Sequence, residues 1–203
     1  MNRISLLAAT TLAACSLALG ACSREAEVPG GDNLAIEPTA EDISNATGND
    51  IGAAQNITFA SGDGAPLGSV MVSEGAGGVT LMIEAIGMPE GVHGIHLHEK
   101  GLCDGPKFES AGAHWNPTSK QHGRDNPAGA HMGDLANITI PASGAASTSV
   151  KVAGAMMGGA GGIIDVDGTA LVVHADPDDY KTDPSGNSGD RIACAVIAPP
   201  MGS

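Results

Sequence analysis

Basic and aromatic side chains are both scarce in this chain of 203 residues. The chain has nine Lys and Arg residues but 23 Asp and Glu residues, so its formal net charge is −14 at pH 7. A surface this acidic repels a phosphate backbone, which excludes nucleic acid as a partner. With two Phe, one Tyr and one Trp, the core has to be built mainly from aliphatic residues, and we expect the eight Met to fill its gaps.

The chain after residue 55 has no long stretch with helical periodicity and no repeat of fixed length. Short alternating stretches dominate instead, and runs rich in glycine and proline separate them. Many short strands with such turns are typical of an antiparallel sandwich or barrel, so the predicted fold class is all-β. No Lys-Ser/Thr pair follows a glycine run, which excludes a phosphate-binding loop. We expect strands within residues 68–73, 79–83, 93–98, 148–152, 169–174 and 192–197.

The one long apolar run, residues 4–19, follows the short basic segment Met1-Asn2-Arg3. It is shorter than the ~20 residues that a membrane-spanning helix needs, which favours a secretory signal over a retained transmembrane helix. Leu19-Gly20-Ala21-Cys22 looks like the lipidation signal of bacterial lipoproteins. We therefore predict a signal peptide over residues 1–21 and a lipidated Cys22. The protein is then exported to the periplasm or cell envelope, and the lipid anchor is its one attachment to a membrane.

Residues 22–55 carry seven acidic side chains and one basic one, with little hydrophobic pattern. This composition predicts a flexible tether between the anchor and a folded domain over residues 56–203. The domain itself has sixteen acidic and seven basic side chains, a net charge near −9. An anionic substrate must therefore be attracted by a local positive group and not by the molecule as a whole.

Cysteine is also rare, and no two of the four are spaced as a CxxC zinc motif. Cys15 would leave with the signal peptide and Cys22 would carry lipid, so Cys103 and Cys194 remain as one possible pair. An oxidising compartment allows these two to form a disulfide. Zinc binding through their thiols is the alternative.

All seven histidines lie within residues 93–174. Neutral imidazole is the commonest nitrogen ligand for copper and zinc, so this clustering indicates a metal site. His96 and His98 are two apart on an expected strand and therefore point to one face, and His174 ends another strand.

Two long segments without strand or helix pattern, residues 99–137 and 176–190, interrupt the alternation. Segments of this length are uncommon in a compact domain unless they carry function. The first contains His114, His122, His131 and Asp134, whose three nitrogens and one oxygen suit a tetrahedral zinc site. A polar surface loop with scattered histidines is the alternative.

The runs around these residues resemble the copper,zinc superoxide dismutase family. The matching runs are Gly94-Ile95-His96-Leu97-His98, Ala113-His114-Trp115-Asn116-Pro117, Lys120-Gln121-His122-Gly123, His131-Met132-Gly133-Asp134, Val172-Val173-His174 and residues 186–197. The resemblance covers residues 56–197 and implies an eight-stranded antiparallel Greek-key β-barrel with two long functional loops. It implies dismutation of superoxide to oxygen and hydrogen peroxide as an extracytoplasmic defence, with one copper and one zinc ion per subunit.

The resemblance also implies a role for each matching residue. The copper ligands would be His96, His98, His114 and His174, and the zinc ligands would be His114, His122, His131 and Asp134. His114 would then be shared between the metals and take up a proton in the reduced state, and Arg191 would pair with the incoming superoxide. Asp178 would link His96 to His122, Cys103 would form a disulfide with Cys194, and His93 would make a structural hydrogen bond.

The segment between Asp178 and Arg191 departs from the animal enzymes, because it is shorter and has Lys181 as its one base. The strength of electrostatic steering therefore does not carry over, and neither does the choice between monomer and homodimer. A non-enzymatic metal-binding module on such a barrel, for example a copper buffer or chaperone, is one alternative. A zinc hydrolase is another, although four protein ligands leave its zinc no open position. Copper-dependent activity separates the dismutase from both.

Overall fold

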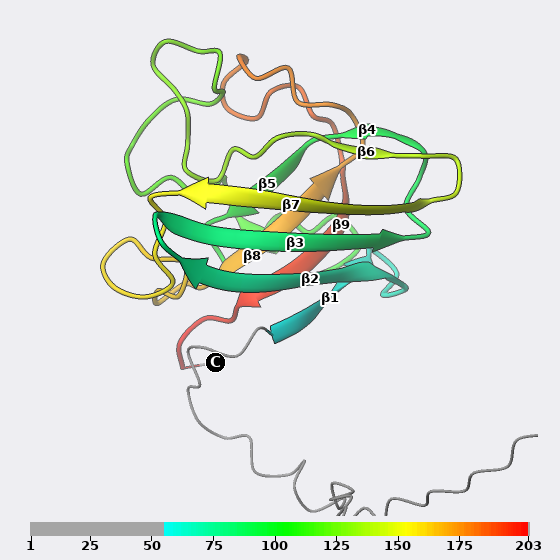
Figure 1. Cartoon of the computed structure of the whole chain (residues 1–203), viewed down its shortest axis with the longest axis horizontal. Coiled ribbons are helices and arrows are strands. Elements are labelled where there is room, and N and C mark those ends of the chain that lie inside the picture. The colour runs from blue at the N-terminus through cyan, green and yellow to red at the C-terminus, as the bar shows by residue number, and fades with distance from the viewer. Residues whose placement is uncertain (1–54, 203) are drawn as a thin grey trace, which may run out of the picture. The chain divides into compact units, whose positions relative to one another are not determined.

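The computed structural model describes residues 55–202, so the predicted signal peptide, the lipidated Cys22 and most of the tether lie outside the described residues. Within this range the chain forms nine strands (Figure 1). They are β1 (Gln55–Ser61), β2 (Pro66–Gly75), β3 (Gly78–Ile86), β4 (Gly91–His93), β5 (Ile95–His98), β6 (Ile138–Ile140), β7 (Ala145–Ala153), β8 (Thr169–His174) and β9 (Arg191–Ala198). No helix in residues 55–202 is long and apolar enough to cross a membrane.

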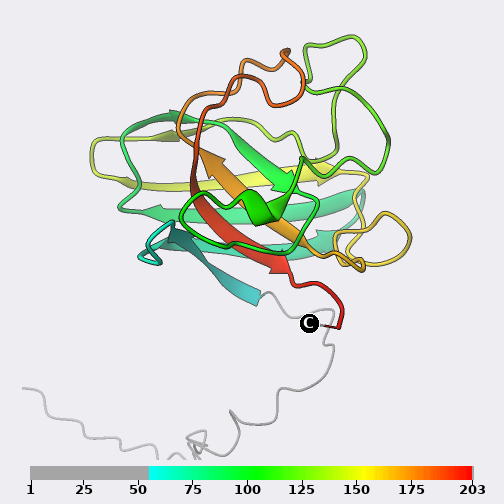
Figure 2. The same cartoon turned by 180° about the vertical axis from the view of Figure 1, so that it is seen from behind.

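Seven strands form one antiparallel sheet in the order β5-β8-β9-β1-β2-β3-β7, and β4 pairs with β6. Several neighbours are far apart in sequence, because β7 pairs with β3 and β8 pairs with β5. Such crossovers are those of a Greek key. Figures 1 and 2 show the sheet curling around its interior. The all-β prediction is confirmed.

The strand expected over residues 93–98 is interrupted at Gly94, which is why the structure has nine strands and the expected barrel eight. The Gly94 N–H donates to the Asp176 carbonyl at 2.9 Å, and the Gly94 carbonyl accepts from the His174 N–H at 2.8 Å. A side chain at Gly94 would approach Ser188 closely, so the break suits glycine. Because of it, β4 turns to β6 while β5 stays with β8.

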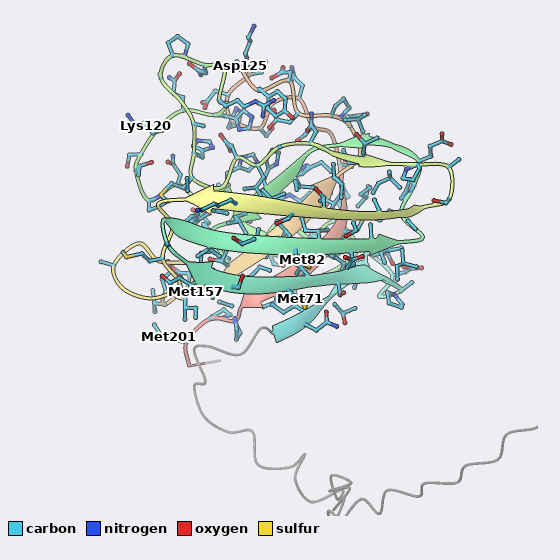
Figure 3. The ribbon with its side chains drawn as sticks, viewed as in Figure 1. Met71, Met82, Lys120, Asp125, Met157 and Met201 are labelled. Atoms are coloured by element: carbon cyan, nitrogen blue, oxygen red, sulfur yellow. A yellow bond between two sulfur atoms is a disulfide. The ribbon has the colours of Figure 1, made fainter. Side chains whose placement is uncertain are left out.

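The core follows the alternation of the strands. On β3, Val79, Leu81 and Ile83 are buried, while Met82 faces outward (Figure 3). Strand β8 is buried throughout, because the main core packs on one of its faces and Phe108 and Ala111 cover the other. Residues 99–112 therefore act as a cover over β8 and β9, as Figure 2 shows.

The expectation that the methionines fill gaps in the core is wrong for three of them, Met82, Met156 and Met201. Met88 is buried, and Met132 and Met157 pack against the core. Met82, Met156 and Met201 are instead between 42 and 61% exposed. Alanine and the β-branched residues already fill the interior, so these thioethers remain on the surface.

The two long segments contain no strand, and the first has a single 3₁₀ turn at Glu109–Ala111. Much of both gathers at one end of the barrel (Figures 1 and 2). The segment 176–190 leaves from the end of β8, which lies beside the start of β5, where Val173 pairs with Ile95. The barrel thus gives the loops a rigid base.

Cys103 and Cys194 form a disulfide that ties the cover to β9, which excludes zinc binding through their thiols. The bond closes a loop of 91 residues.

Replacing both cysteines by serine should lower the free energy of unfolding by about 2–4 kcal/mol, because the unfolded chain regains its conformational freedom. Urea unfolding of metal-free protein would measure this, with reduced wild-type protein as the control. A change below about 0.5 kcal/mol would contradict the expectation, because it is no larger than that of an ordinary surface substitution.

Candidate metal centre

Four buried histidines form the first group of possible metal ligands. Strand β5 supplies His96 and His98, and β8 ends in His174. His114 joins them because its segment runs beside β5, where the Trp115 N–H donates to the Leu97 carbonyl at 2.8 Å. One nitrogen of each of the four rings lies within 4.8 Å of the others. We call these four the copper set, after the role that the resemblance implies for them.

Hydrogen bonds to backbone carbonyls orient two of these rings. The Nδ1 of His98 lies 3.0 Å from the Gly112 carbonyl, and the Nδ1 of His174 lies 3.3 Å from that of Gly189. Each of the four rings also has one buried nitrogen without a hydrogen-bond partner: His96 Nδ1, His98 Nε2, His114 Nε2 and His174 Nε2. Four converging unsatisfied acceptors are costly unless a cation binds between them, so this group fits a metal ion.

Burial sets the protonation of the copper set. It lowers the pKa of His114 to about 4 and that of His174 to about 3, and it holds the pKa of His98 well below its usual value. These rings are therefore neutral near pH 7, which is the form that binds metal.

A second group surrounds the carboxylate of Asp134. The Nδ1 atoms of His114, His122 and His131 lie 2.9, 3.0 and 3.1 Å from Asp134 Oδ1. One carboxylate oxygen has two lone pairs and does not suit three donors at once, whereas four ligand atoms at such separations can share one ion. The other oxygen, Oδ2, accepts from the Gly123 and His131 backbone N–H groups. We call these four residues the zinc set, again after the role that the resemblance implies.

The charges of this group are strongly coupled. Burial alone would raise the pKa of Asp134, but hydrogen bonds from His114, His122 and the Gly123 N–H hold it far below its usual value. Burial likewise opposes protonation of His122, but the carboxylates at its two nitrogens raise its pKa to about 9.

His114 and Asp178 connect the two groups. His114 is a member of both groups; its Nδ1 lies 2.9 Å from Asp134 Oδ1, and its Nε2 is buried without a hydrogen-bond partner. Asp178 is buried, with Oδ2 2.9 Å from His96 Nε2 and Oδ1 3.0 Å from His122 Nε2. Gly186, at φ +63°, packs so closely on the Asp178 carboxylate that a side chain would overlap it. One ring and one carboxylate therefore join the sets.

Arg191 is the first residue of β9 and lies half-buried beside the cover. Its Nη1 donates to the Phe108 carbonyl at 2.6 Å, and its Nη2 donates to the Gly112 carbonyl at 2.7 Å. The Gly112 carbonyl also orients His98, so the guanidinium is held next to the copper set. Burial lowers the pKa of Arg191 and nearby Glu109 opposes this, and the side chain remains charged.

Comparison with known proteins agrees with this geometry. Residues 67–197 match the family model of copper/zinc superoxide dismutase (SODC). The chain belongs to this family. It is 46% identical to "Superoxide dismutase [Cu-Zn]" of Caulobacter vibrioides over 140 residues, which cover 67% of this chain and 80% of that protein.

Two solved structures support the same fold. A SOD-like protein from Bacillus subtilis is 36% identical with a TM-score of 0.68, covering 71% of this chain and 100% of its own. The Cu/Zn superoxide dismutase from Brucella abortus is 26% identical with a TM-score of 0.55, covering 71% and 99%. This member of the family is therefore an oxidoreductase that dismutes superoxide, and its cofactors are copper and zinc.

Of the other residues expected in the dismutase site, His93 stands apart from both sets. Its ring nitrogens lie 2.8 Å from the His174 carbonyl and 3.0 Å from the Pro89 carbonyl. It therefore braces the end of β8 through the backbone. Cys22 lies outside the described residues.

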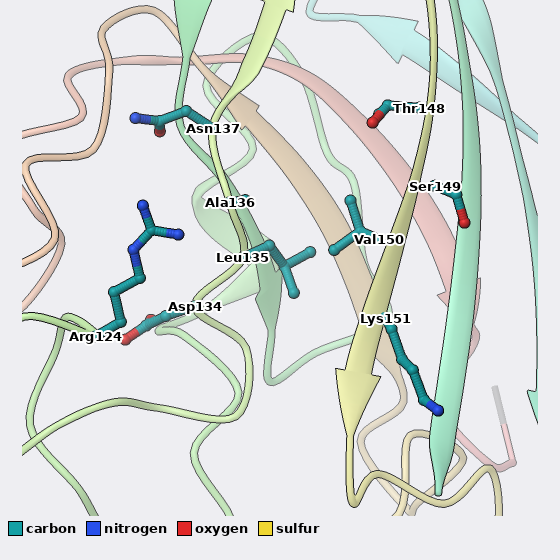
Figure 4. Close-up of a pocket in the computed structure, with 9 residues that line it drawn as sticks. All are labelled: Arg124, Asp134, Leu135, Ala136, Asn137, Thr148, Ser149, Val150 and Lys151. Carbon is teal, nitrogen blue, oxygen red and sulfur yellow. The ribbon is translucent and has the colours of Figure 1, made fainter. Parts of the chain in front are cut away.

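A hollow of about 360 Å³ adjoins the zinc set between β7 and residues 134–137 (Figure 4). It touches no histidine, and Asp134 is the one member of either set among its lining residues. The lining residues are Arg124, Asp134, Leu135, Ala136, Asn137, Thr148, Ser149, Val150 and Lys151.

Sequence reasoning did not anticipate Gly112, Asn137 or Tyr180 in this dismutase. Gly112 acts through its carbonyl, which every residue has, so the residue type carries no signal. Asn137 contacts Asp178 and Tyr180 from 41 and 43 positions away in sequence, and the Tyr180 N–H donates to Asp178 Oδ1. In the sequence, Asn137 and Tyr180 are marked only by lying three residues after Asp134 and two after Asp178. That closeness indicates a role only once the fold brings the two loops together.

Proposed function

We propose that His114 bridges a copper ion and a zinc ion in an extracytoplasmic superoxide dismutase. The observation that carries the proposal is the position of the His114 ring, with Nδ1 facing Asp134 and a buried, partnerless Nε2 facing the copper set. His96, His98 and His174 would complete the copper ligands, and His122, His131 and Asp134 would complete the zinc ligands.

Bound copper would supply the one-electron redox chemistry of the dismutation, and zinc would hold its loop in place. Arg191 would attract and orient the superoxide anion with its fixed guanidinium fork. His114 Nε2 is the atom that would carry a proton when it is not bound as a ligand. The hydrogen bonds of His98 and His174 to backbone carbonyls would keep their rings in place throughout.

The dismutase assignment is tested by following superoxide decay after pulse generation with the full-length chain. Protein loaded with copper and zinc should remove superoxide in a second-order process, and zinc-only protein should not. Metal analysis of both samples is the control. Absence of copper-dependent decay in fully loaded protein would favour a metal-binding module instead.

The bridge has a spectroscopic test. With Cu(II) in the copper set and high-spin Co(II) in the zinc set, a shared imidazole should couple the two spins and suppress the copper EPR signal. Replacing His114 by alanine should restore the copper signal where both metals remain bound. An unsuppressed signal in loaded wild-type protein would show that no bridge exists.

Glu109 offers a prediction about substrate attraction. Its exposed carboxylate interacts with Arg191 and opposes an approaching anion. Glu109→Gln should raise the second-order rate constant up to about twofold at low ionic strength, and the gain should fade with added salt. Glu74→Gln, at an exposed position near the end of β2, is the matched control and should change little. An equal response of both variants would show that only net charge matters.

The extracytoplasmic location is part of the proposal and is supported by the predicted signal peptide and lipidation signal at Cys22. The test is to express the full chain in a Gram-negative host with a labelled fatty acid. The wild-type chain should appear lipidated in the membrane fraction, and Cys22→Ser should abolish the label. Unlabelled wild-type protein in the cytoplasm would overturn this part.

A further inference from the structure

Asn137 forms a two-way pair with the backbone of Asp178. Its Nδ2 donates to the Asp178 carbonyl at 3.0 Å, and its Oδ1 accepts from the Asp178 N–H at 3.0 Å. The Asn137 backbone N–H donates to the Tyr180 hydroxyl at 2.8 Å. Three hydrogen bonds therefore tie one residue to the short stretch 178–180.

The two residues of this pair, Asn137 and Asp178, lie in different kinds of structure. Asn137 directly precedes β6, which pairs with β4, so the barrel holds it. It also follows Asp134 of the zinc set by three residues, and both lie along the same wall in Figure 4. Asp178 belongs to the segment 176–190, which has no strand or helix of its own. Asn137 thus fixes a residue of the loop to a residue of the barrel.

The position of Asp178 matters because its carboxylate spans two histidines. Its oxygens lie 2.9 Å from His96 Nε2 and 3.0 Å from His122 Nε2. A shift of about 1 Å would break one of these contacts, because hydrogen bonds weaken steeply beyond about 3.2 Å. The backbone of Asp178 therefore has to be held in place, and Asn137 is the side chain that holds it.

Tyr180 strengthens the same connection. Its ring lies under the Arg124 guanidinium, with 3.7 Å between the Arg124 Cζ and the ring centroid. Its carbonyl accepts from the Asp125 N–H at 3.0 Å. Residues 124 and 125 are two and three positions after His122, so Tyr180 joins the segment that carries His122 to the one that carries Asp178.

We propose that Asn137 is a positioning residue for the zinc site, holding Asp178 where one carboxylate reaches both His96 and His122. The inference rests on the proposed zinc ligands. Asn137 acts by limiting the movement of Asp178, so its loss allows His122 to turn away from the ion. Outer partners of metal-binding histidines typically contribute about 10–100-fold to metal affinity.

The test is the zinc affinity of the full-length chain, measured by competition with a chromogenic chelator. Asn137→Ala should weaken zinc binding about tenfold, at the lower end of the range for outer partners. Tyr180→Phe, which removes one hydroxyl, should weaken it less and is the variant to use if Asn137→Ala does not fold. In protein loaded with both metals, Asn137→Ala should also alter the Cu(II) EPR line shape, because His96 loses its fixed partner.

Asn116→Ala is the matched control. Asn116 forms the same kind of two-way pair, with the Lys120 carbonyl at 2.8 Å and the Lys120 N–H at 3.0 Å, but its side chain is hydrogen-bonded to neither Asp178 nor a ring of either set. It should destabilise its loop and leave the zinc affinity within twofold of wild type. The inference is overturned if Asn137→Ala stays within twofold of wild type, or if Asn116→Ala loses as much affinity. Asp134→Ala distinguishes a failure of the proposed zinc ligands from a failure of the role given to Asn137. Unchanged zinc binding in Asp134→Ala would refute the zinc ligands themselves.

Discussion

Replacing Arg191 by alanine should lower the second-order rate constant for superoxide removal about tenfold or more at low ionic strength. The domain is strongly acidic, so an anion reaches the copper set through a local positive charge. Arg191 supplies that charge in a fixed direction, since two backbone carbonyls hold its guanidinium. Pulse-generated superoxide, followed over a range of salt concentrations, measures the effect.

Two features distinguish this expectation from simple damage to the site. Arg191→Ala also frees the Gly112 carbonyl, so copper content must be shown to match the wild type. Arg191→Lys keeps the charge but loses the planar guanidinium, so its second-order rate constant should lie between those of the wild type and Arg191→Ala. A fully loaded Arg191→Ala variant with an unchanged rate constant and salt dependence would contradict the role given to this residue.

Replacing Asp178 by alanine should weaken zinc binding about 10–100-fold, because His122 loses the partner at its second nitrogen. Asp178→Asn should be nearly as harmful. Its side chain offers one acceptor oxygen, whereas His96 and His122 both direct Nε2 at this carboxylate. Chelator competition measures the zinc affinity, and Cu(II) EPR reports the change at His96.

Asp179→Asn provides the control for Asp178. The neighbouring carboxylate carries the same charge but is exposed, and it binds Thr182, Lys181 and Asn187 within its own loop. Removing it should leave zinc affinity within about threefold of wild type, because no ligand histidine depends on it. If both substitutions weakened zinc binding equally, negative charge alone, and not the contact with His96 and His122, would account for the effect.

Much of the fold could be predicted, because hydrophobic alternation records which face of a strand meets the core. Residues 79–83 alternate in sequence, and Val79, Leu81 and Ile83 are buried in the structure. The short strand β6 was not predicted, since three residues are too few for a period to show. The break at Gly94 was also missed, because it depends on hydrogen bonds with Asp176 and His174, distant in sequence.

The sequence by itself determined the fold class and the chemistry available to the site. Strand alternation indicated a β-structure, and the clustered histidines with Asp134 indicated a metal site. The roles of Asp178 and Arg191 were implied by the resemblance of the runs around them to the family. These properties belong to residue types and short spacings, so they can be recognised before folding.

Only the tertiary structure decided how these groups meet. It placed His114 in both groups of possible ligands and directed four ring nitrogens of the two sets at backbone carbonyls or at Asp178. It also paired the backbone of Asp178 with the side chain of Asn137. Each contact joins residues that are 14 to 82 positions apart in sequence. Contacts at such distances depend on loop closure and strand pairing, and no local pattern records them.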